Sequence, residues 1–351
     1  MLSKRLTPTS RDARHTHQAN RFPALSHWIQ QLPIWVWAVY LVILGLLIVV
    51  FNALAWFAGL VPVGTFDLYR SSIPCYPIGS MMLMVYLNRV ARRALANFRP
   101  ALAISNRDYS DLEHQLTTMP RRGIQITLLL SFGLVAVYLA NTPYILILIQ
   151  QSPLIAMIEG AFYTFAFALM GVYFYHTLWQ LWMVNRIHAM LTDIDLFNRA
   201  PLYAFSRLSS RTGISLLLMN FFGIVTDPAT FSNVALINVT VMAFVLAVLS
   251  FLLPLQGISR RIIAEKRRLL QAINQHFGAL VHEMYAADDS LATNDAPQNA
   301  QLLHSVATTR SIVESIPTLP WERGTLIGFA LAFLLTFMGR VLIAVIASLF
   351  I

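Results

Sequence analysis

The chain has 351 residues, of which 57% are hydrophobic and 12% charged, and its mean hydropathy is +0.62. A soluble domain carries about 25% charged residues, so this composition excludes an ordinary water-soluble protein and predicts lipid over much of the surface. Cys75 is the only cysteine, which excludes an internal disulfide and a metal site built from thiolates. The net charge is +9. Because the basic residues lie near the ends of apolar segments, we expect them to face the anionic headgroups of a lipid bilayer, and we predict no nucleic-acid partner.

The distribution of the basic residues predicts the orientation of the chain in the membrane. All Lys and Arg residues except Arg70 and Arg340 lie in four stretches, which are 1–33, 88–122, 184–212 and 256–324. Basic residues concentrate in the cytoplasmic loops of multi-pass proteins, so these four stretches are predicted to be cytoplasmic. We therefore expect a multi-pass protein of the cytoplasmic (plasma) membrane with a cytoplasmic N-terminus. An organelle membrane is the alternative.

Residues 1–33 form the first region. They are basic and contain no apolar stretch of 7–15 residues followed by a small-residue cleavage site, so they do not resemble a secretory signal peptide. We interpret them as a disordered basic cytoplasmic tail. A transit peptide for an organelle is the alternative, since such peptides are also rich in Arg and poor in acidic residues.

The first half of the membrane bundle, predicted over 34–255, contains apolar segments of unequal length. Residues 34–66 carry no charge and are long enough to cross a bilayer with tilt, whereas the second segment, 72–87, is short and interrupted by Pro74, Pro77 and Gly79. A third span begins at Gly123 and ends near 141–143. The apolar patch 144–149 that follows is too short to cross a membrane. It is expected either to extend the third helix or to lie at the outer surface.

The second half contains two confident spans and one short segment. Residues 154–184 and 233–255 are long enough to cross, but 214–225 covers only 12 residues, well below the roughly 20 that a perpendicular helix needs. The short segment is either a span extended past Asp227 and Pro228 or a partial helix shielded by its neighbours. The last span is predicted over 325–351. Similar Arg–Gly and Asn–Arg boundaries recur along the chain and suggest three parallel helical hairpins plus a seventh helix, a kind of repeat that occurs in transporters.

The region 256–324 is predicted to form a cytoplasmic helical hairpin. Apolar residues recur at helical spacing from Ile258 to Met284, which indicates that the sixth span continues as an amphipathic stalk. A polar linker over 287–300 is followed by a second apolar stripe over 302–316. We expect the stretch 256–316 to be the surface for a protein partner, if the chain has one.

Motifs for chemistry are missing from the sequence. There is no phosphate-binding loop, no glycine-rich dinucleotide turn and no pair of cysteines, and His282-Glu283 lacks the second histidine of a zinc-binding helix because Ala286 stands at that position. We therefore predict no catalytic, cofactor-binding or metal-binding residue and no enzymatic activity.

Two charged residues in the predicted spans are expected to pair. A charge in the hydrocarbon core costs on the order of 3 kcal/mol or more. At 1.5 Å per residue, Glu159 on the fourth span and Arg340 on the last one both fall about 8 Å below the outer boundary of a core that is about 30 Å thick. We predict that these two form an intramembrane ion pair and that their helices are neighbours.

Uncharged polar residues also lie in the predicted spans. His176 is close to several aromatic residues near the inner end of the fourth span, which favours a place in the interfacial aromatic belt. Asn52, Asn220 and Asn238 are candidates for interhelical hydrogen bonds, with solute binding as the alternative.

Together these patterns predict an all-α fold, a polytopic bundle of six or seven spans with cytoplasmic loops at 88–122 and 184–212, the hairpin at 256–324 and a last transmembrane helix at 325–351. The function that fits best is a non-enzymatic sensor, regulatory or assembly module that couples the bundle to the hairpin. A small-solute or ion transporter or channel is the alternative. A lipid-modifying enzyme comes third, because no paired His, Asp or Ser constellation is found.

Overall fold

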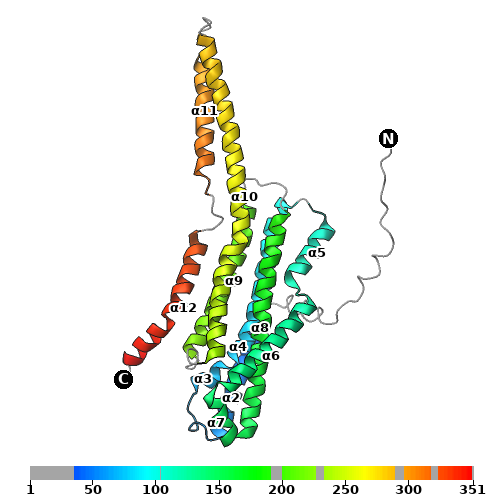
Figure 1. The fold of residues 1–351 in the computed structure, drawn as a ribbon, viewed down its shortest axis with the longest axis vertical. Helices are drawn as coiled ribbons and strands as arrows, with labels where there is room; N and C mark the ends of the chain where they lie inside the picture. Colours follow the sequence, from blue (N-terminus) through cyan, green and yellow to red (C-terminus); the bar gives the residue numbers. More distant parts are fainter. Residues whose placement is uncertain are drawn as a thin grey trace, which may run out of the picture.

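The computed structural model describes residues 35–102, 104–190, 200–226, 233–288, 296–317 and 323–349. All regular structure in these ranges is helical, and the helices form an elongated bundle from which one hairpin projects (Figure 1). Five segments are long and apolar enough to cross a membrane: Val36–Phe57, Asn106–Ala140, Pro153–Ala189, Tyr203–Thr226 and Val234–Leu253. The predicted all-α class is therefore confirmed for the described residues, which include five candidate membrane-spanning helices, and a total of six or seven spans stays a prediction. The tail 1–33 lies outside the described residues.

The first helix, α2 (Trp35–Phe57), is shorter than the apolar run 34–66. The chain leaves the helix through Gly59 and Gly64, whose φ angles of 67° and 87° lie in the left-handed region that favours glycine. It then enters α3 (Leu68–Ser72), where the Asp67 carboxylate caps the helix by accepting from the backbone N–H groups of Tyr69 and Arg70. Hydropathy alone extends the first span too far, because it does not register this turn.

The next helix, α4 (Cys75–Phe98), is longer than the predicted segment 72–87. Pro74 is its N-cap and Pro77 lies in its first turn, where a missing N–H costs nothing, so neither proline interrupts the helix. At its other end α4 continues past Asn88 into the predicted loop 88–122, because a buried apolar face runs on to Phe98. A 3-10 turn, η2 (Arg99–Ala101), ends it.

Three shorter or peripheral helices follow. In α5 (Asn106–Thr117) the N-cap is Ser105, whose hydroxyl accepts from the backbone N–H of Asp108. Helix α6 (Arg121–Ala140) closely matches the predicted third span. The apolar patch after it forms a separate helix, α7 (Pro143–Gln151), which packs against α8.

Helix α8 (Pro153–Ala189) includes the predicted fourth span, and α9 (Ala200–Thr226) extends well beyond the short predicted segment 214–225. Helix α9 gains its length at its N-terminal end, inside the predicted loop 184–212. Most of the residues described there are buried although several are polar: Phe205, Leu208, Ser206, Ser209, Ser210 and Thr212. Shielding by neighbouring helices, rather than apolar side chains, therefore accommodates this segment.

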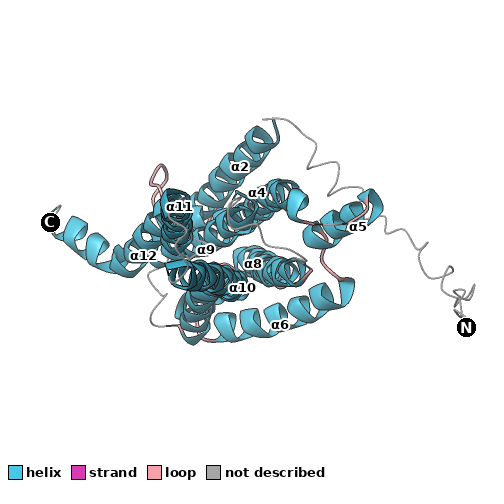
Figure 2. Cartoon of the chain, turned by 90° about the horizontal axis from the view of Figure 1, so that it is seen from above, coloured by secondary structure: helices cyan, strands magenta, loops and turns pink. Residues whose placement is uncertain are grey.

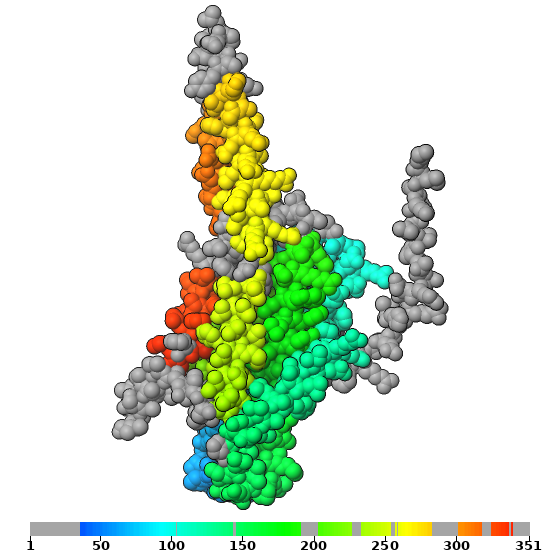
Figure 3. Space-filling view, in the orientation of Figure 1, coloured from blue at the N-terminus to red at the C-terminus, as the bar shows by residue number. Residues whose placement is uncertain are grey.

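The remaining helices are α10 (Val234–Asp288), α11 (Ala296–Ser315) and α12 (Arg323–Leu349). The sixth span and the predicted stalk are one continuous helix of 55 residues. Helix α11 packs back along the outer part of α10, and Figure 3 shows the two projecting beyond the bundle. We call the end of the bundle from which they project the hairpin end, and the opposite end the α7 end.

Four helices, α4, α8, α9 and α10, form the centre of the bundle. Helix α9 packs against α4, α10 and α12, while α8 packs against α4, α6 and α10; seen from above, α6 and α2 lie at opposite sides (Figure 2). One apolar core lies at the hairpin end, between α4, α5, α8 and α9, and a second one fills the middle of the bundle. Large apolar side chains are exposed on the outer faces of α2, α6, α10 and α12, as expected for helices in lipid.

Candidate functional site

A buried ion cluster lies at the α7 end. Arg70 on α3 and Glu159 on α8 are 4% and 2% exposed, and the Nε of Arg70 is 3.2 Å from Oε1 of Glu159. A second nitrogen of the same guanidinium contacts the carboxylate of Asp67. A buried charge is costly unless it is paired, so each member of this cluster depends on the others. The cluster ties the short helix α3 to the start of α8.

The partner of Glu159 in this cluster differs from the one that the sequence predicts. Matched depth predicts Arg340 as its partner, whereas the structure pairs it with Arg70. Helix α12, which carries Arg340, packs along α9, and among the described residues α8 and α12 do not form an extensive contact. The predicted proximity of these two helices is therefore wrong. The Arg340 side chain lies outside the described part of the structure.

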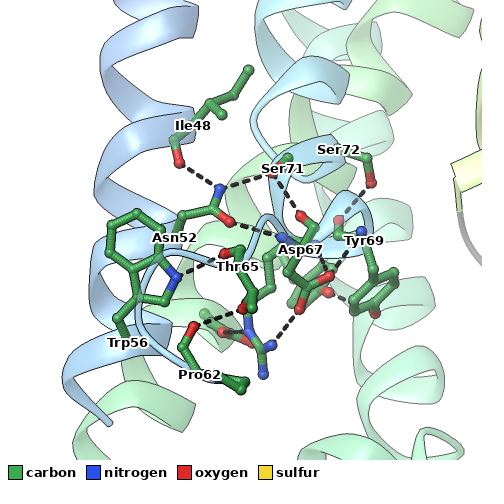
Figure 4. Close-up of polar contacts among 12 residues, drawn as sticks. Ile48, Asn52, Trp56, Pro62, Thr65, Asp67, Tyr69, Ser71 and Ser72 are labelled. Atoms are coloured by element: carbon green, nitrogen blue, oxygen red, sulfur yellow. Dashed lines mark hydrogen bonds and ion pairs between the residues drawn. The ribbon is translucent and has the colours of Figure 1, made fainter. Parts of the chain in front are cut away.

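Asn52 connects α2 to the same end of the bundle, as Figure 4 shows. Its Nδ2 donates to the carbonyl of Ile48 at 2.9 Å and to Oγ of Ser71 at 2.8 Å, while its Oδ1 accepts from the backbone N–H of Asp67 at 3.0 Å. Asn52 thus makes the interhelical hydrogen bonds that the sequence predicts for it. It fixes the residue that caps α3 and contacts Arg70.

Three tyrosine hydroxyl groups form a chain beside the ion cluster. The hydroxyl of Tyr163 on α8 donates to that of Tyr69 on α3 at 2.7 Å, and the hydroxyls of Tyr69 and Tyr138 on α6 are 2.9 Å apart. The rings of Tyr138 and Tyr163 pack with their centroids 5.2 Å apart. The polar groups at the α7 end are therefore satisfied largely by one another.

A cavity of about 70 Å³ lies next to these tyrosines, in the middle of the bundle. Helices α4, α6, α8, α9 and α10 line it, mostly with Phe, Met, Ala and branched aliphatic side chains. Its polar lining includes Asn220, whose Nδ2 donates to the carbonyl of Thr240 at 3.3 Å. One water molecule needs about 10–15 Å³ of such volume, so the cavity has room for several waters or one small group. Asn238 is exposed on α10, away from the cavity.

A second polar cluster lies between α4 and α8, toward the hairpin end. Oδ1 of Asn88 accepts from Nε2 of His176 at 2.9 Å and from Nε2 of Gln180 at 2.8 Å. Since an amide oxygen only accepts, Nε2 of His176 carries the proton. With an exposed fraction of 1%, His176 is an interior residue, so the predicted place in the aromatic belt is wrong. In that region Trp179 and Trp182 stack on each other, and Trp182 is exposed.

Sequence reasoning missed most partners in both clusters. Arg70 lies outside the four basic stretches, and Asn88 stands at the start of the predicted cytoplasmic loop 88–122. The sequence does contain a signal that Gln180 belongs with His176. Gln180 lies one turn after His176, on the same face of the helix. Nothing in the local sequence around Tyr69, Tyr138 and Tyr163 indicates that their hydroxyls meet.

The described residues contain no group of three His, Cys, Asp or Glu side chains that could hold a metal ion. Comparisons with protein-family models, with curated proteins and with solved structures give no match for this chain.

Proposed function

We propose that the protein is a non-enzymatic membrane sensor or regulatory module in which the bundle controls the position of the α10–α11 hairpin. One observation supports this proposal above the others. Helix α10 lines the cavity with Leu236, Val239, Thr240 and Ala243 and then continues without interruption to Asp288 in the hairpin. A continuous helix transmits a small shift at one end to the other, because packed helices move as rigid elements.

At the base of the hairpin, α11 is attached to α10 by hydrogen bonds. Nζ of Lys266 donates to the carbonyl oxygens of Glu314 and Ile316, at 2.6 and 2.9 Å, at the C-terminal end of α11. A lysine at this position satisfies carbonyls that have no partner within the helix. Val313 and Ile316 are buried at the same level. A shift of α10 therefore carries α11 with it.

The exposed face of the hairpin is the proposed surface for a protein partner within 256–316. Phe277 on α10 and Leu302 and Ile312 on α11 expose large apolar side chains there. The same arrangement serves an assembly subunit, in which the partner binds permanently, and a regulator, in which its binding depends on the state of the bundle.

We place the hairpin in the cytoplasm and the protein in the plasma membrane. Two arginines near the hairpin end lie over tryptophan rings, Arg89 at 5.5 Å from the Trp37 ring and Arg186 at 5.7 Å from the Trp182 ring. Tryptophan at a membrane interface and arginine near anionic headgroups are both typical of the cytoplasmic boundary. With Cys75 replaced, a cysteine at Ser305 should resist an impermeant thiol reagent in intact cells, and one at Thr65 should react. The reverse pattern would invert this orientation.

The coupling is tested by filling the cavity and measuring the hairpin. In a Cys75→Ser background, spin labels at Leu129 on α6 and Gly278 on α10 report the distance between bundle and hairpin. Ala243→Phe places a ring in the cavity and should shift that distance distribution. Val241→Phe, on the exposed face of the same helix, is the matched control and should leave it unchanged. An unchanged distribution in a correctly folded Ala243→Phe protein would contradict the coupling.

Transport of a small solute or an ion is the second candidate, since polar clusters flank the cavity at both ends. In proteoliposomes, transport predicts a flux of glycerol or protons above that of protein-free vesicles, lowered by Ala243→Phe but not by Val241→Phe. A flux equal to that of empty vesicles would leave the sensor as the supported function.

A further inference from the structure

Several buried polar atoms toward the hairpin end have no hydrogen-bond partner among the described residues. They are Nδ1 of His176, Oε1 of Gln180, Oγ of Ser209 and Oγ1 of Thr212. All four side chains are almost fully buried; His176 is 1% exposed and the other three 0%. A buried polar atom without a partner costs about 1–3 kcal/mol, so four in one region call for a common explanation.

Two contacts show that these atoms lie along the same stretch of α8 and α9. Tyr173 on α8 and Ser215 on α9 have their hydroxyl oxygens 2.7 Å apart, and farther toward the hairpin the rings of His188 and Phe205 lie 5.1 Å apart. The two helices are therefore antiparallel. His176 and Gln180 fall between the two contacts along α8, and Ser209 and Thr212 fall between them along α9.

Helix α4 provides the third wall of the same region. Asn88 occupies its only side-chain oxygen with His176 and Gln180, so it orients these two side chains and leaves Nδ1 and Oε1 as acceptors. The hydroxyls of Ser209 and Thr212 can both donate and accept. These five side chains carry no carboxylate, ammonium or guanidinium group, so they favour a neutral ligand over an ion.

The region also adjoins the cavity. Tyr173 lies next to Phe174, which lines the cavity, and Ser215 lies one turn before Met219 and Asn220, which line it from α9. The hydroxyl pair of Tyr173 and Ser215 thus provides polar groups between the unpartnered atoms and the cavity.

We propose that Asn88, His176, Gln180, Ser209 and Thr212 form a binding site for water and for neutral solutes of similar size. Water both donates to the two acceptors and bonds the two hydroxyls, as internal waters do at buried polar groups. The site is a hydrated inlet from the hairpin end toward the cavity. It does not depend on the proposed coupling of α10 to the hairpin.

Aqueous access is tested with cysteines and the silver ion, a probe close to water in size. In a Cys75→Ser background, Ser209→Cys and Thr212→Cys should react with Ag⁺ at least about tenfold faster than Leu208→Cys and Leu217→Cys. The two leucines are equally buried on the same helix but lie in apolar cores, where a thiol reacts only after local opening. Equal rates at all four positions would overturn the proposal.

The sign of the change in melting temperature on substitution gives an independent test. If water bonds the hydroxyls, Thr212→Val and Ser209→Ala lose a hydrogen bond and should each lower the melting temperature in detergent, by about 2 °C or more. If the hydroxyls have no partner at all, the same substitutions remove a desolvated polar atom and raise the melting temperature. An increase for both variants would therefore refute the site, whatever the silver experiment shows.

Discussion

The two ends of the bundle interior contain polar clusters of opposite character. At the α7 end, Arg70 contacts the carboxylates of Glu159 and Asp67, and the neighbouring tyrosine hydroxyls bond one another. Toward the hairpin end, the cluster of Asn88, His176 and Gln180 is uncharged and leaves acceptors without a protein partner. Charges that satisfy each other hold helices together, whereas neutral groups with spare hydrogen-bonding capacity bind a ligand. We therefore attribute a structural role to the first cluster, and the proposed binding role belongs to the second.

The ion cluster should produce the largest loss of stability when it is broken. Glu159→Gln leaves a buried guanidinium short of one partner, and Arg70→Gln leaves two carboxylates facing each other without a cation. Arg70→Gln should lower the free energy of unfolding by about 3–5 kcal/mol, because the carboxylates lose their cation, and Glu159→Gln should lower it by less, because the guanidinium keeps Asp67 as its partner. Thermal and denaturant unfolding in detergent would measure the loss.

The double variant of Arg70 and Glu159 sharpens this prediction. Since the second substitution removes the charge that the first left unpaired, the double variant should lose less than the sum of the two single losses. Strictly additive losses would contradict the pairing. Glu159→Gln combined with Arg340→Gln is the matched control, and those two losses should add.

The Asn88 cluster should show an intermediate effect. Asn88→Leu removes the oxygen that accepts from both His176 and Gln180, so two buried donors lose their partner, at about 1–3 kcal/mol each in the absence of another acceptor. If water occupies the site, it bonds the released donors, and the measured loss should lie at the lower end of this range, at about 1 kcal/mol for each donor and about 2 kcal/mol in all. Gln180→Leu, which removes a whole hydrogen-bonding side chain, is the companion variant. A loss as large as that of Arg70→Gln would remove the distinction between the two clusters.

The tyrosine chain should show the smallest effect. Tyr163→Phe removes one hydroxyl at the end of the chain and should cost about 1 kcal/mol, the usual net value of one hydrogen bond. Tyr69→Phe removes the central hydroxyl, which contacts two others, and should cost more. Equal melting temperatures for the two variants would show that the hydroxyls do not act as a chain.

Local patterns in the sequence predict much of this fold. The continuity of α10 follows from apolar residues that keep helical spacing beyond the end of the sixth span, and α6 and α8 begin and end close to the predicted positions. The patterns fail to predict a helix where a polar segment is buried by neighbouring helices. Thr212 and Ser209 look like loop residues by hydropathy, yet they lie in α9 because α4, α10 and α12 surround that helix.

The candidate sites were much less predictable. Asn52 was correctly assigned to an interhelical hydrogen bond, and Asn220 to a polar contact between helices, since an amide in a span has few other ways to be satisfied. Depth along a helix follows from residue number alone, so Glu159 could be placed near one boundary. Its partner could not be chosen, because depth says nothing about which helices are adjacent or which way each one faces.

The sequence by itself determined the all-helical class of the described residues, several candidate membrane-spanning helices and a long helix leading out of the bundle. These features follow from composition, the length of apolar runs and residue spacing, which are properties of one segment at a time. The tertiary structure alone decided that Arg70 contacts Glu159, that Asn88 orients His176 and Gln180, and that Ser209 and Thr212 lie along the same stretch of the bundle. Each of these depends on the rotation and order of separate helices, and these are set by how side chains from distant segments pack together.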